Sequence, residues 1–315
     1  MKIFDFRVFL ALIILLCMTS CGDDDPGDAD TFVSISELFK SLEPPIQTYT
    51  IEDPKEASTI KGDEGTVINV MANAFTDQHN DPVTTPITVN LNEYLSLEDM
   101  FMGNVQTTSN EQILITGGSF ELSFEDVNGN AVNPSPFSLQ ASIPVQTDVS
   151  GFENDLRYFT GERINVDGRE IVDWDVQSNS ETWFVDGTFN IAGLEQGLSN
   201  CDVLFSMAGE SPTQFSVSID GVTDYSKSSV WLFIDDFPSV VVLTVINDTG
   251  DALKTYENSI PKNLKATLLA IHIDDDNYLK YGSLPITVAG DDLFTVNVDF
   301  GTTSGLEALV QTITN

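Results

Sequence analysis

Short runs in which apolar and polar residues alternate recur along this chain, and they limit its fold more than any other feature. Residues 66–70, 87–91 and 120–124 alternate in this way in the first half. Sequences rich in Gly, Asn, Asp and Pro, such as 61–63 and 79–82, separate the runs and are typical of turns. A period of two places successive side chains on opposite faces of a strand, so each run predicts a strand with one buried face.

The second half of the chain continues the same pattern. Five further runs indicate strands, at residues 215–219, 230–234, 240–245, 267–273 and 293–298. Short strands at this spacing favour antiparallel sandwiches over βαβ units. At about 150 residues per domain, a chain of 315 residues has room for two domains. We therefore predict an all-β protein with two antiparallel, Ig-like β-sandwich domains.

Two short helices are expected outside the strands. Ser34 and Glu37 fit a capping box, and Leu38, Phe39 and Leu42 follow at helical spacing, which predicts a helix that ends before the Pro-Pro pair at 44–45. Residues 304–313 predict a second, closing helix.

The domain boundary is expected in the stretch 146–181, which is richer in Asp, Asn and Gly and alternates less than its surroundings. We place the boundary near Val176. The first domain with its connecting strap then covers 46–175, and the second covers 176–315. The same stretch could instead be an ordered strap packed across both domains.

The first twenty residues have the features of an export signal. Lys2 and Arg7 precede an apolar run at 8–16, which is too short to span a membrane. A small residue then precedes Cys21, and this end of the run resembles the lipobox of bacterial lipoproteins. The resemblance implies a signal peptide at 1–20, acylation of Cys21, and an acidic tether with the short helix at 21–45. The alternative is an ordinary secretory signal with a chance Cys.

Acidic residues follow Cys21 directly. Asp23, Asp24 and Asp25 are similar to the signal that directs Bacteroidota lipoproteins to the outer face of the outer membrane. The resemblance implies a lipid-anchored protein of the outer membrane that is exposed on the cell surface, with fatty acyl chains such as palmitate on the anchor. One acyl chain binds membranes only marginally, whereas the two or three chains of this class would hold the protein permanently.

The charge balance excludes several classes of function. Lys and Arg number 13 against 49 Asp and Glu, a formal net charge of −36. Such a surface repels phosphate backbones, so no nucleic-acid partner is expected. The hydrophobic fraction of 41% is enough for real cores, so the acidity does not indicate disorder. After cleavage only Cys21 and Cys201 remain, and lipidation of Cys21 leaves Cys201 without a disulfide partner, as a small buried hydrophobe.

Several motifs resemble one family along residues 46–315. They lie at residues 59–62, 65–75, 81–89, 117–120, 126–130, 155–162, 173–175, 200–202 and 259–261. Together they are similar to a family of Bacteroidota surface lipoproteins whose N-terminal β-sandwich is distantly similar to that of ankyrins, netrin receptors and tight-junction scaffold proteins. The resemblance implies surface display and β-sandwich architecture, and it implies no catalytic residues. Met71 stands where a Pro usually occurs in the distant relatives.

Catalytic motifs are present only as fragments. Residues 248–250 read Asp-Thr-Gly as in aspartic proteases, but that chemistry needs two such triplets, and the sequence also suits a hairpin turn. Ser58 and Lys61 match S-x-x-K without its companion motifs. We expect His79 in a turn and His272 on a solvated strand face. We therefore predict that the protein is not an enzyme, and that a hydrolase would need a pocket with two close carboxylates or a Ser–His pair.

Two weaker types of binding site remain open. Asp274, Asp275 and Asp276 fall in a turn, as do the pairs Asp235-Asp236 and Asp291-Asp292, and calcium often takes its oxygen ligands from such turns, although the EF-hand spacing is absent. No cofactor is predicted otherwise. Trp183, Tyr278 and Tyr281 could stack on sugars, although core packing explains a Trp more simply.

The favoured function is a non-catalytic, lipid-anchored cell-surface protein with a binding or structural role. Its expected partners are the outer membrane, through the lipid anchor, and a protein or glycan ligand. The alternative is a glycan-binding accessory lipoprotein that works with an outer-membrane nutrient transporter.

Overall fold

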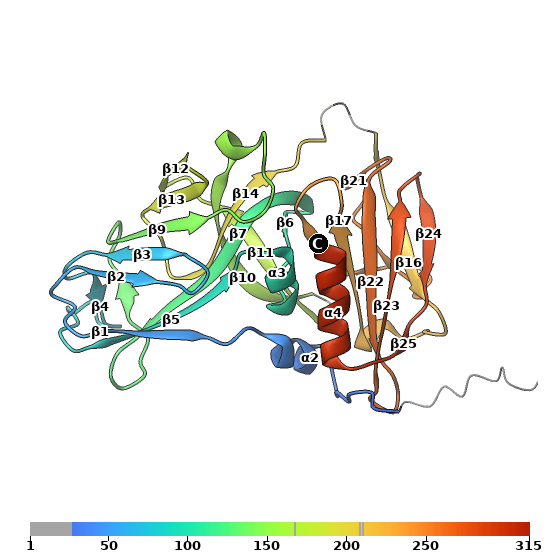
Figure 1. Cartoon of the computed structure of the whole chain (residues 1–315), viewed down its shortest axis with the longest axis horizontal. Coiled ribbons are helices and arrows are strands. Elements are labelled where there is room, and N and C mark those ends of the chain that lie inside the picture. Colours follow the sequence, from blue (N-terminus) through green and yellow to red (C-terminus); the bar gives the residue numbers. More distant parts are fainter. Residues whose placement is uncertain (1–26, 167, 208, 210) are drawn as a thin grey trace, which may run out of the picture.

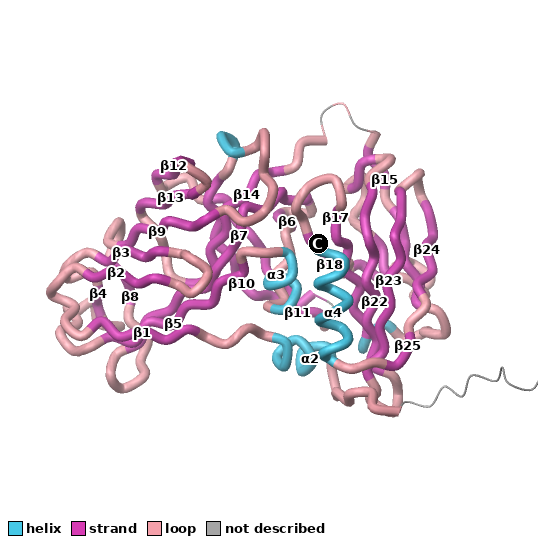
Figure 2. Tube along the Cα trace, viewed as in Figure 1, coloured by secondary structure: helices cyan, strands magenta, loops and turns pink. Residues whose placement is uncertain are grey.

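Strands dominate the structure, which is a computed structural model that describes residues 27–315 except 167, 208 and 210 (Figures 1 and 2). The predicted signal peptide, Cys21 and Asp23–Asp25 lie outside the described residues. With 47% strand and 11% helix in several mainly antiparallel sheets, the all-β prediction is confirmed. None of the described helices is long and apolar enough to cross a membrane.

The first β unit, residues 46–205, consists of two facing sheets. The larger sheet contains β1 (Gln47–Ile51), β5 (Ile87–Tyr94), β7 (Gln112–Glu125), β14 (Gly197–Leu204), β10 (Arg157–Val166) and β11 (Arg169–Val176) in that order, with β6 (Thr108–Ser109) paired to β7. The smaller sheet contains β12 (Glu181–Val185), β13 (Thr188–Ala192), β9 (Leu139–Pro144), β3 (Val67–Val70) and β2 (Ser58–Lys61). The short pair β4 (Phe75–Thr76) and β8 (Asn133–Pro134) closes one end.

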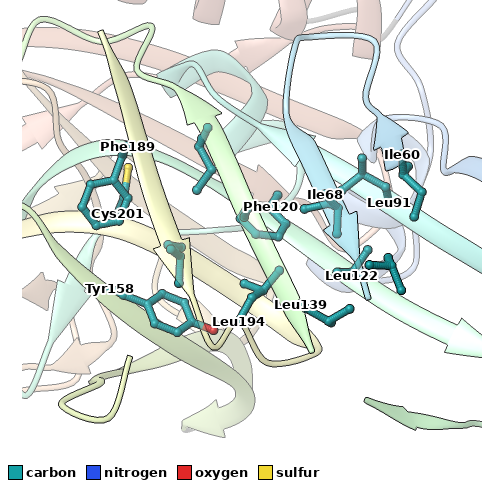
Figure 3. Close-up of a cluster of buried hydrophobic side chains, with 14 of the residues drawn as sticks. Ile60, Ile68, Leu91, Phe120, Leu122, Leu139, Tyr158, Phe189, Leu194 and Cys201 are labelled. Carbon is teal, nitrogen blue, oxygen red and sulfur yellow. The ribbon is translucent and has the colours of Figure 1, made fainter. Parts of the chain in front are cut away.

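A hydrophobic core fills the space between these two sheets and makes the unit sandwich-like (Figure 3). Phe120 and Leu122 of the larger sheet meet Ile68 and Leu139 of the smaller one. Cys201 is fully buried in this core, as expected for a small hydrophobe.

The second β unit, residues 211–300, again has two main sheets. One contains β19 (Val245–Ile246), β20 (Leu253–Lys254), β16 (Phe215–Ile219) and β24 (Asp292–Val296). The other contains β18 (Val240–Val242), β17 (Ser228–Ile234), β22 (Lys265–Ile273), β23 (Leu279–Thr287) and β25 (Asp299–Phe300). A short pair joins β15 (Pro212–Thr213) to β21 (Ile260–Pro261), and β16 pairs with β24 in parallel. A second hydrophobic core lies between the sheets.

Three helices lie between the two β units (Figures 1 and 2). They are α2 (Ile35–Leu42), α3 (Leu97–Met102) and α4 (Thr303–Thr314). Helices α2 and α4 confirm the two predicted helices, whereas α3 was not predicted. Ser34 caps α2 by accepting a hydrogen bond from the Glu37 amide, and the Glu37 carboxylate accepts one from the Val33 amide.

The helices contribute to a third hydrophobic core, here called the shared core. Its largest members come from all parts of the chain: Phe39 and Phe101 of the helices, Trp174 of the first unit, and Trp231 and Phe233 of the second. The ring of Phe101 lies 5.3 Å from that of Phe39 and 5.1 Å from that of Trp231. Because this apolar contact is continuous, the two units cannot separate without exposing aromatic surface to water.

The shared core explains why β17 is buried at all seven positions. One face of its sheet covers the second unit's core and the other covers the shared core. A strand buried on both faces loses its polar alternation, which is why 230–234 is an unbroken apolar run.

Strand pairing crosses the boundary expected near Val176. Three strands follow that residue and still belong to the first unit: β13 pairs with β9, β14 pairs with β7 and β10, and β12 pairs with β13. The strands after Leu204, from β15 at Pro212 on, pair only with one another. The expected strap 146–181 also holds β10 and β11, and β11 is the edge strand of the larger sheet.

Candidate functional site

The three aspartates considered for calcium do not converge on a common point. One carboxylate oxygen of Asp274 accepts hydrogen bonds from the amides of Asp276 and Tyr278, and its other oxygen lies 3.3 Å from Lys280 Nζ. Asp274 therefore stabilises its own turn, while Asp275 and Asp276 are exposed. Within the described part of the chain, no group of three His, Cys, Asp or Glu residues is arranged to hold a metal ion.

The three aromatic residues considered for sugar stacking lie on different parts of the molecule. Trp183 is 47% exposed on β12, the edge strand of the smaller sheet in the first unit. Tyr278 belongs to the second unit and makes an edge contact with Phe300 at 5.8 Å. Tyr281 packs against the shared core. The structure thus exposes Trp183 but does not bring the three rings together.

The structure contains one Ser–His pair. His272 Nδ1 lies 2.9 Å from the Ser228 hydroxyl, and the two residues are direct partners on β17 and β22. Ser228 is 1% exposed, so its hydroxyl is closed to a substrate. Burial lowers the pKa of His272, although nearby Asp274 opposes this shift. The pair is therefore a cross-strand contact that stabilises the sheet.

The other motif fragments are parts of secondary structure. Gly250, with a φ of 78°, lies in the turn that joins β19 to β20, so 248–250 forms the hairpin that its sequence suits. Ser58 and Lys61 lie three apart on β2 and therefore point to opposite faces.

Two carboxylates approach each other near the 62–66 turn of the first unit. Glu93 is buried and accepts hydrogen bonds from the side chain of Gln47 at 3.0 Å and from the amides of Glu64 and Thr66 at 2.8 Å each. Burial, reinforced by the charges of Asp99 and Glu93, raises the pKa of Glu64 to about 7. With its oxygens occupied by turn donors, Glu93 clamps the β2–β3 turn to β5.

A cleft of about 620 Å³ between the two units is the best candidate for ligand contact. Four segments form its walls: the start of α3, the loop 146–148, the turn that joins β17 to β18, and the end of α4. Clefts where units meet are common binding sites because both sides can contribute side chains.

The cleft has an apolar floor. Phe237 stacks on Phe205 with ring centroids 4.6 Å apart, and both rings pack against the cores of both β units. Leu97 of α3 and Ile313 of α4 extend this surface toward the shared core. An apolar group of a ligand can pack on Phe237, Leu97 and Ile313 in this part of the cleft.

Carboxylates surround the apolar floor. Glu98, Asp148, Asp235 and Asp236 line the cleft, and none of its described lining residues is Lys or Arg. Burial raises the pKa of Glu98, with Asp99 and Glu307 adding to the shift. Burial and the charge of Asp236 also raise the pKa of Asp235, against an opposing effect of Lys265. The cleft thus favours a ligand that is both cationic and partly apolar.

The walls of the cleft are held by hydrogen bonds across the two units. The Thr107 amide donates to Val240 O at 2.7 Å, and the Thr116 amide donates to Pro238 O at 2.9 Å. The Thr107 and Ser239 hydroxyls are 2.8 Å apart. Because these groups are buried, the bonds fix the turn 235–238 against β7 and keep the cleft preformed.

A buried acid lies in the same polar region. Asp202 of β14 is fully buried, accepts a hydrogen bond from the Asn200 side chain at 2.6 Å, and pairs with Thr116 in the sheet register. Burial raises the pKa of Asp202 to about 8 despite hydrogen bonds from Thr116, Asn200 and Gly117. The carboxyl is therefore protonated in the folded protein at neutral pH.

The sequence singled out only part of the cleft. Asp235 and Asp236 were recognised as an acidic turn, but Glu98, Asp148 and Phe237 were not. Residues 235–238 read Asp-Asp-Phe-Pro directly after an apolar run. This combination of two charges and an aromatic ring in one turn was the sequence feature that could have indicated the cleft.

Comparison with known proteins gives no assignment. No family model matches the chain, and neither a curated protein nor a solved structure matches it.

Proposed function

We propose that this protein is a non-catalytic, lipid-anchored protein of the bacterial cell surface that binds its ligand in the cleft between two Ig-like β-sandwich domains. The lipobox-like segment at Cys21 and the adjacent Asp23–Asp25 support the anchor and the surface location. The motifs shared with Bacteroidota surface lipoproteins support the same class. Facing sheets around separate cores support the sandwich architecture.

The observation behind the binding role is the combination of apolar and acidic side chains in a cleft whose described lining residues include no Lys or Arg. An aliphatic or aromatic group can pack on Phe237, and a cationic group can then lie beside Asp235 and Asp236. A polypeptide segment with both basic and apolar side chains has this chemistry, so we propose such a segment as the ligand class.

A defined peptide tests this binding role. A hexapeptide of alternating lysine and leucine is titrated by calorimetry into the mature protein, with a peptide of alternating glutamate and leucine as the control. The lysine peptide should bind and the glutamate peptide should not. The double variant Asp235→Asn/Asp236→Asn should bind the lysine peptide about tenfold more weakly, since two neighbouring charges are lost.

The matched variant Asp275→Asn/Asp276→Asn changes the net charge equally at a turn outside the cleft. It should bind the lysine peptide almost as tightly as the unmodified protein. Equal weakening by both double variants would show that net charge rather than the cleft attracts the peptide, and it would contradict the proposed site.

A glycan-binding accessory lipoprotein, working with an outer-membrane nutrient transporter, is the second candidate. The exposed indole of Trp183 favours it, because an exposed Trp offers a flat surface for a sugar ring. The protein should then bind on a glycan array, and Trp183→Ala should abolish that binding while Tyr278→Phe leaves it intact. Binding that survives Trp183→Ala would contradict this site.

A further inference from the structure

The chain enters the described structure along the edge of the second β unit. The Phe32 amide donates to Asn277 O at 2.9 Å, and the Leu279 amide donates to Asp30 O at 2.8 Å. Thr31 forms an antiparallel bridge with Tyr278 between these two bonds. Residues 30–32, here called the docked segment, therefore pair like a short strand with residues 277–279 at the start of β23.

The side chain of Asp30 also attaches the docked segment to the start of α4. Its carboxylate accepts hydrogen bonds from the Thr303 amide at 2.6 Å and from the Thr303 hydroxyl at 2.9 Å. Thr303 is the first residue of α4, so the carboxylate lies at the positive end of the helix dipole. In addition, the Asp30 amide donates to Gly301 O at 3.1 Å.

The distance between this docked segment and Cys21 is short. Asp30 is nine positions after Cys21, and a fully extended chain of nine steps reaches at most about 32 Å. Whatever path the tether takes, a lipid on Cys21 lies within that distance of Asp30.

The cleft lies at the opposite end of the second unit. Helix α4 extends about 15 Å from Thr303, beside Asp30, to Ile313 in the cleft wall. Strand β22 covers about 30 Å from Lys265, beside Asp236, to Ile273, next to the 274–278 turn. Figure 1 shows the first described residues, in blue, near β25 and the lower end of α4, while the C-terminus lies at the other end of this helix.

We propose that the 274–278 turn, Gly301 and the docked segment 30–32 form the membrane-proximal end of the anchored protein, and that the cleft opens at the membrane-distal end. The inference rests on the proposed lipid anchor at Cys21. It adds a favoured orientation, in which the contacts of Asp30 keep one end of the second unit nearer the anchor and the cleft faces away from the lipid surface toward a soluble or neighbouring partner.

The charge of the proximal end keeps it from lying flat on the lipid. The carboxylates of this end include those of Asp30, Asp220, Asp224, Asp274, Asp275 and Asp276. The basic groups that face them are Lys227, which bonds to the Asn277 side chain at 2.9 Å, and Lys280, which pairs with Asp274. An anionic membrane repels the net negative end over about 8 Å at physiological salt, so the tether holds the unit close without adhesion.

Energy transfer to the membrane tests the orientation. Asp275→Cys and Asp235→Cys carry the same charge change at opposite ends of β22, and each accepts a maleimide fluorophore, while Cys201 is buried and stays unlabelled. The lipidated protein is placed in vesicles of phosphatidylcholine and phosphatidylglycerol that contain an acceptor-labelled lipid. Transfer from position 275 should be at least about twofold more efficient than from position 235, since the sites lie about 30 Å apart. Equal or reversed efficiencies would overturn the proposed orientation.

Substitution of Asp30 tests the role of the docked segment. Asp30→Ala removes the acceptor for both Thr303 bonds and should bring the ratio of the two efficiencies toward one. Asp30→Asn keeps an acceptor oxygen and should leave the ratio close to that of the unmodified protein. An unchanged ratio in Asp30→Ala would show that these contacts do not set the orientation.

Flotation of the protein with the vesicles tests the lipid anchor separately from the orientation. A chain that lacks the lipid will not float with the vesicles, which contradicts the proposed function rather than the orientation. The same two labelled variants, with residues 1–21 replaced by a hexahistidine tag on nickel-chelating lipid, then test the orientation independently. More efficient energy transfer from position 275 than from position 235 supports the proposed orientation, and the reverse order overturns it.

Discussion

The buried carboxyl group of Asp202 makes the stability of this protein depend on pH. Most of the 49 acidic residues are solvated, but Asp202 is fully buried beside Asn200 and Thr116. Its pKa of about 8 means that the folded protein retains a proton there that an unfolded chain releases near its ordinary value of 3.8. Neither its burial nor its pKa could be predicted from the sequence, because Asn200-Cys201-Asp202 also suits a polar turn.

This linkage predicts how stability depends on pH. Between pH of about 4 and about 8 the folded state binds one more proton at Asp202, so the free energy of unfolding falls as pH rises. Asp202→Asn removes that dependence and should raise the free energy of unfolding by on the order of 2 kcal/mol near pH 8, with little change at pH 4. Urea unfolding at both pH values measures it, with Asp276→Asn as an exposed control. A loss of stability at pH 8 in Asp202→Asn would contradict the buried, protonated carboxyl.

Elements with one buried face were the ones that the sequence predicted best. The alternation at 87–91 and 215–219 corresponds to β5 and β16, because each strand has its apolar face on a core. Helix α3 was missed because six residues are too few to show a helical period. Strands β10 and β11 were missed because their burial does not alternate regularly: Tyr158 and Phe159 are buried in succession, and Arg169 is a buried charged residue. The parallel pairing of β16 with β24 depends on distant residues and has no local signal.

The shared core predicts that the elements around it unfold together. Phe101→Ala removes a fully buried ring that contacts Phe39, Trp231 and Phe233, and it should cost about 3–5 kcal/mol. Because the ring links both units, the loss should also split or broaden the single transition expected in calorimetry. Phe75→Ala, in the core of the first unit alone, should lower the midpoint and keep one transition. Two separate transitions in the unmodified protein would contradict the coupling.

At the scale of the whole molecule, the candidate site depends on how the two units meet. The acidic turn at Asp235-Asp236 could be read from the sequence, but its meeting with Glu98 and Asp148 could not. Glu98 and Asp148 precede Asp235 by 137 and 87 positions, and the contacts between the two units bring all three into one cleft. Part of the net charge of −36 is concentrated in two clusters of acidic side chains, one at the cleft and one at the end of the second unit near Asp30.

The proposed export signal at Asp23–Asp25 predicts where the whole protein is located. Changing Asp23, Asp24 and Asp25 together to Asn should move the protein from the outer face of the outer membrane to its inner leaflet, because the acidic signal next to Cys21 is lost. The thermal midpoint should not change, since these residues precede the docked segment. Protease added to intact cells measures the exposed fraction, and Asp28→Asn is the control. Undiminished cleavage of the triple variant would contradict the role of the three aspartates.

We propose above that a lipid on Cys21 holds this β protein at the cell surface. Mass spectrometry of the N-terminal peptide from purified outer membranes tests this anchor. We expect a mature chain that begins at Cys21 and carries fatty acyl chains on that residue. A chain that begins elsewhere with an unmodified Cys21, or one that is recovered from the medium, would contradict it.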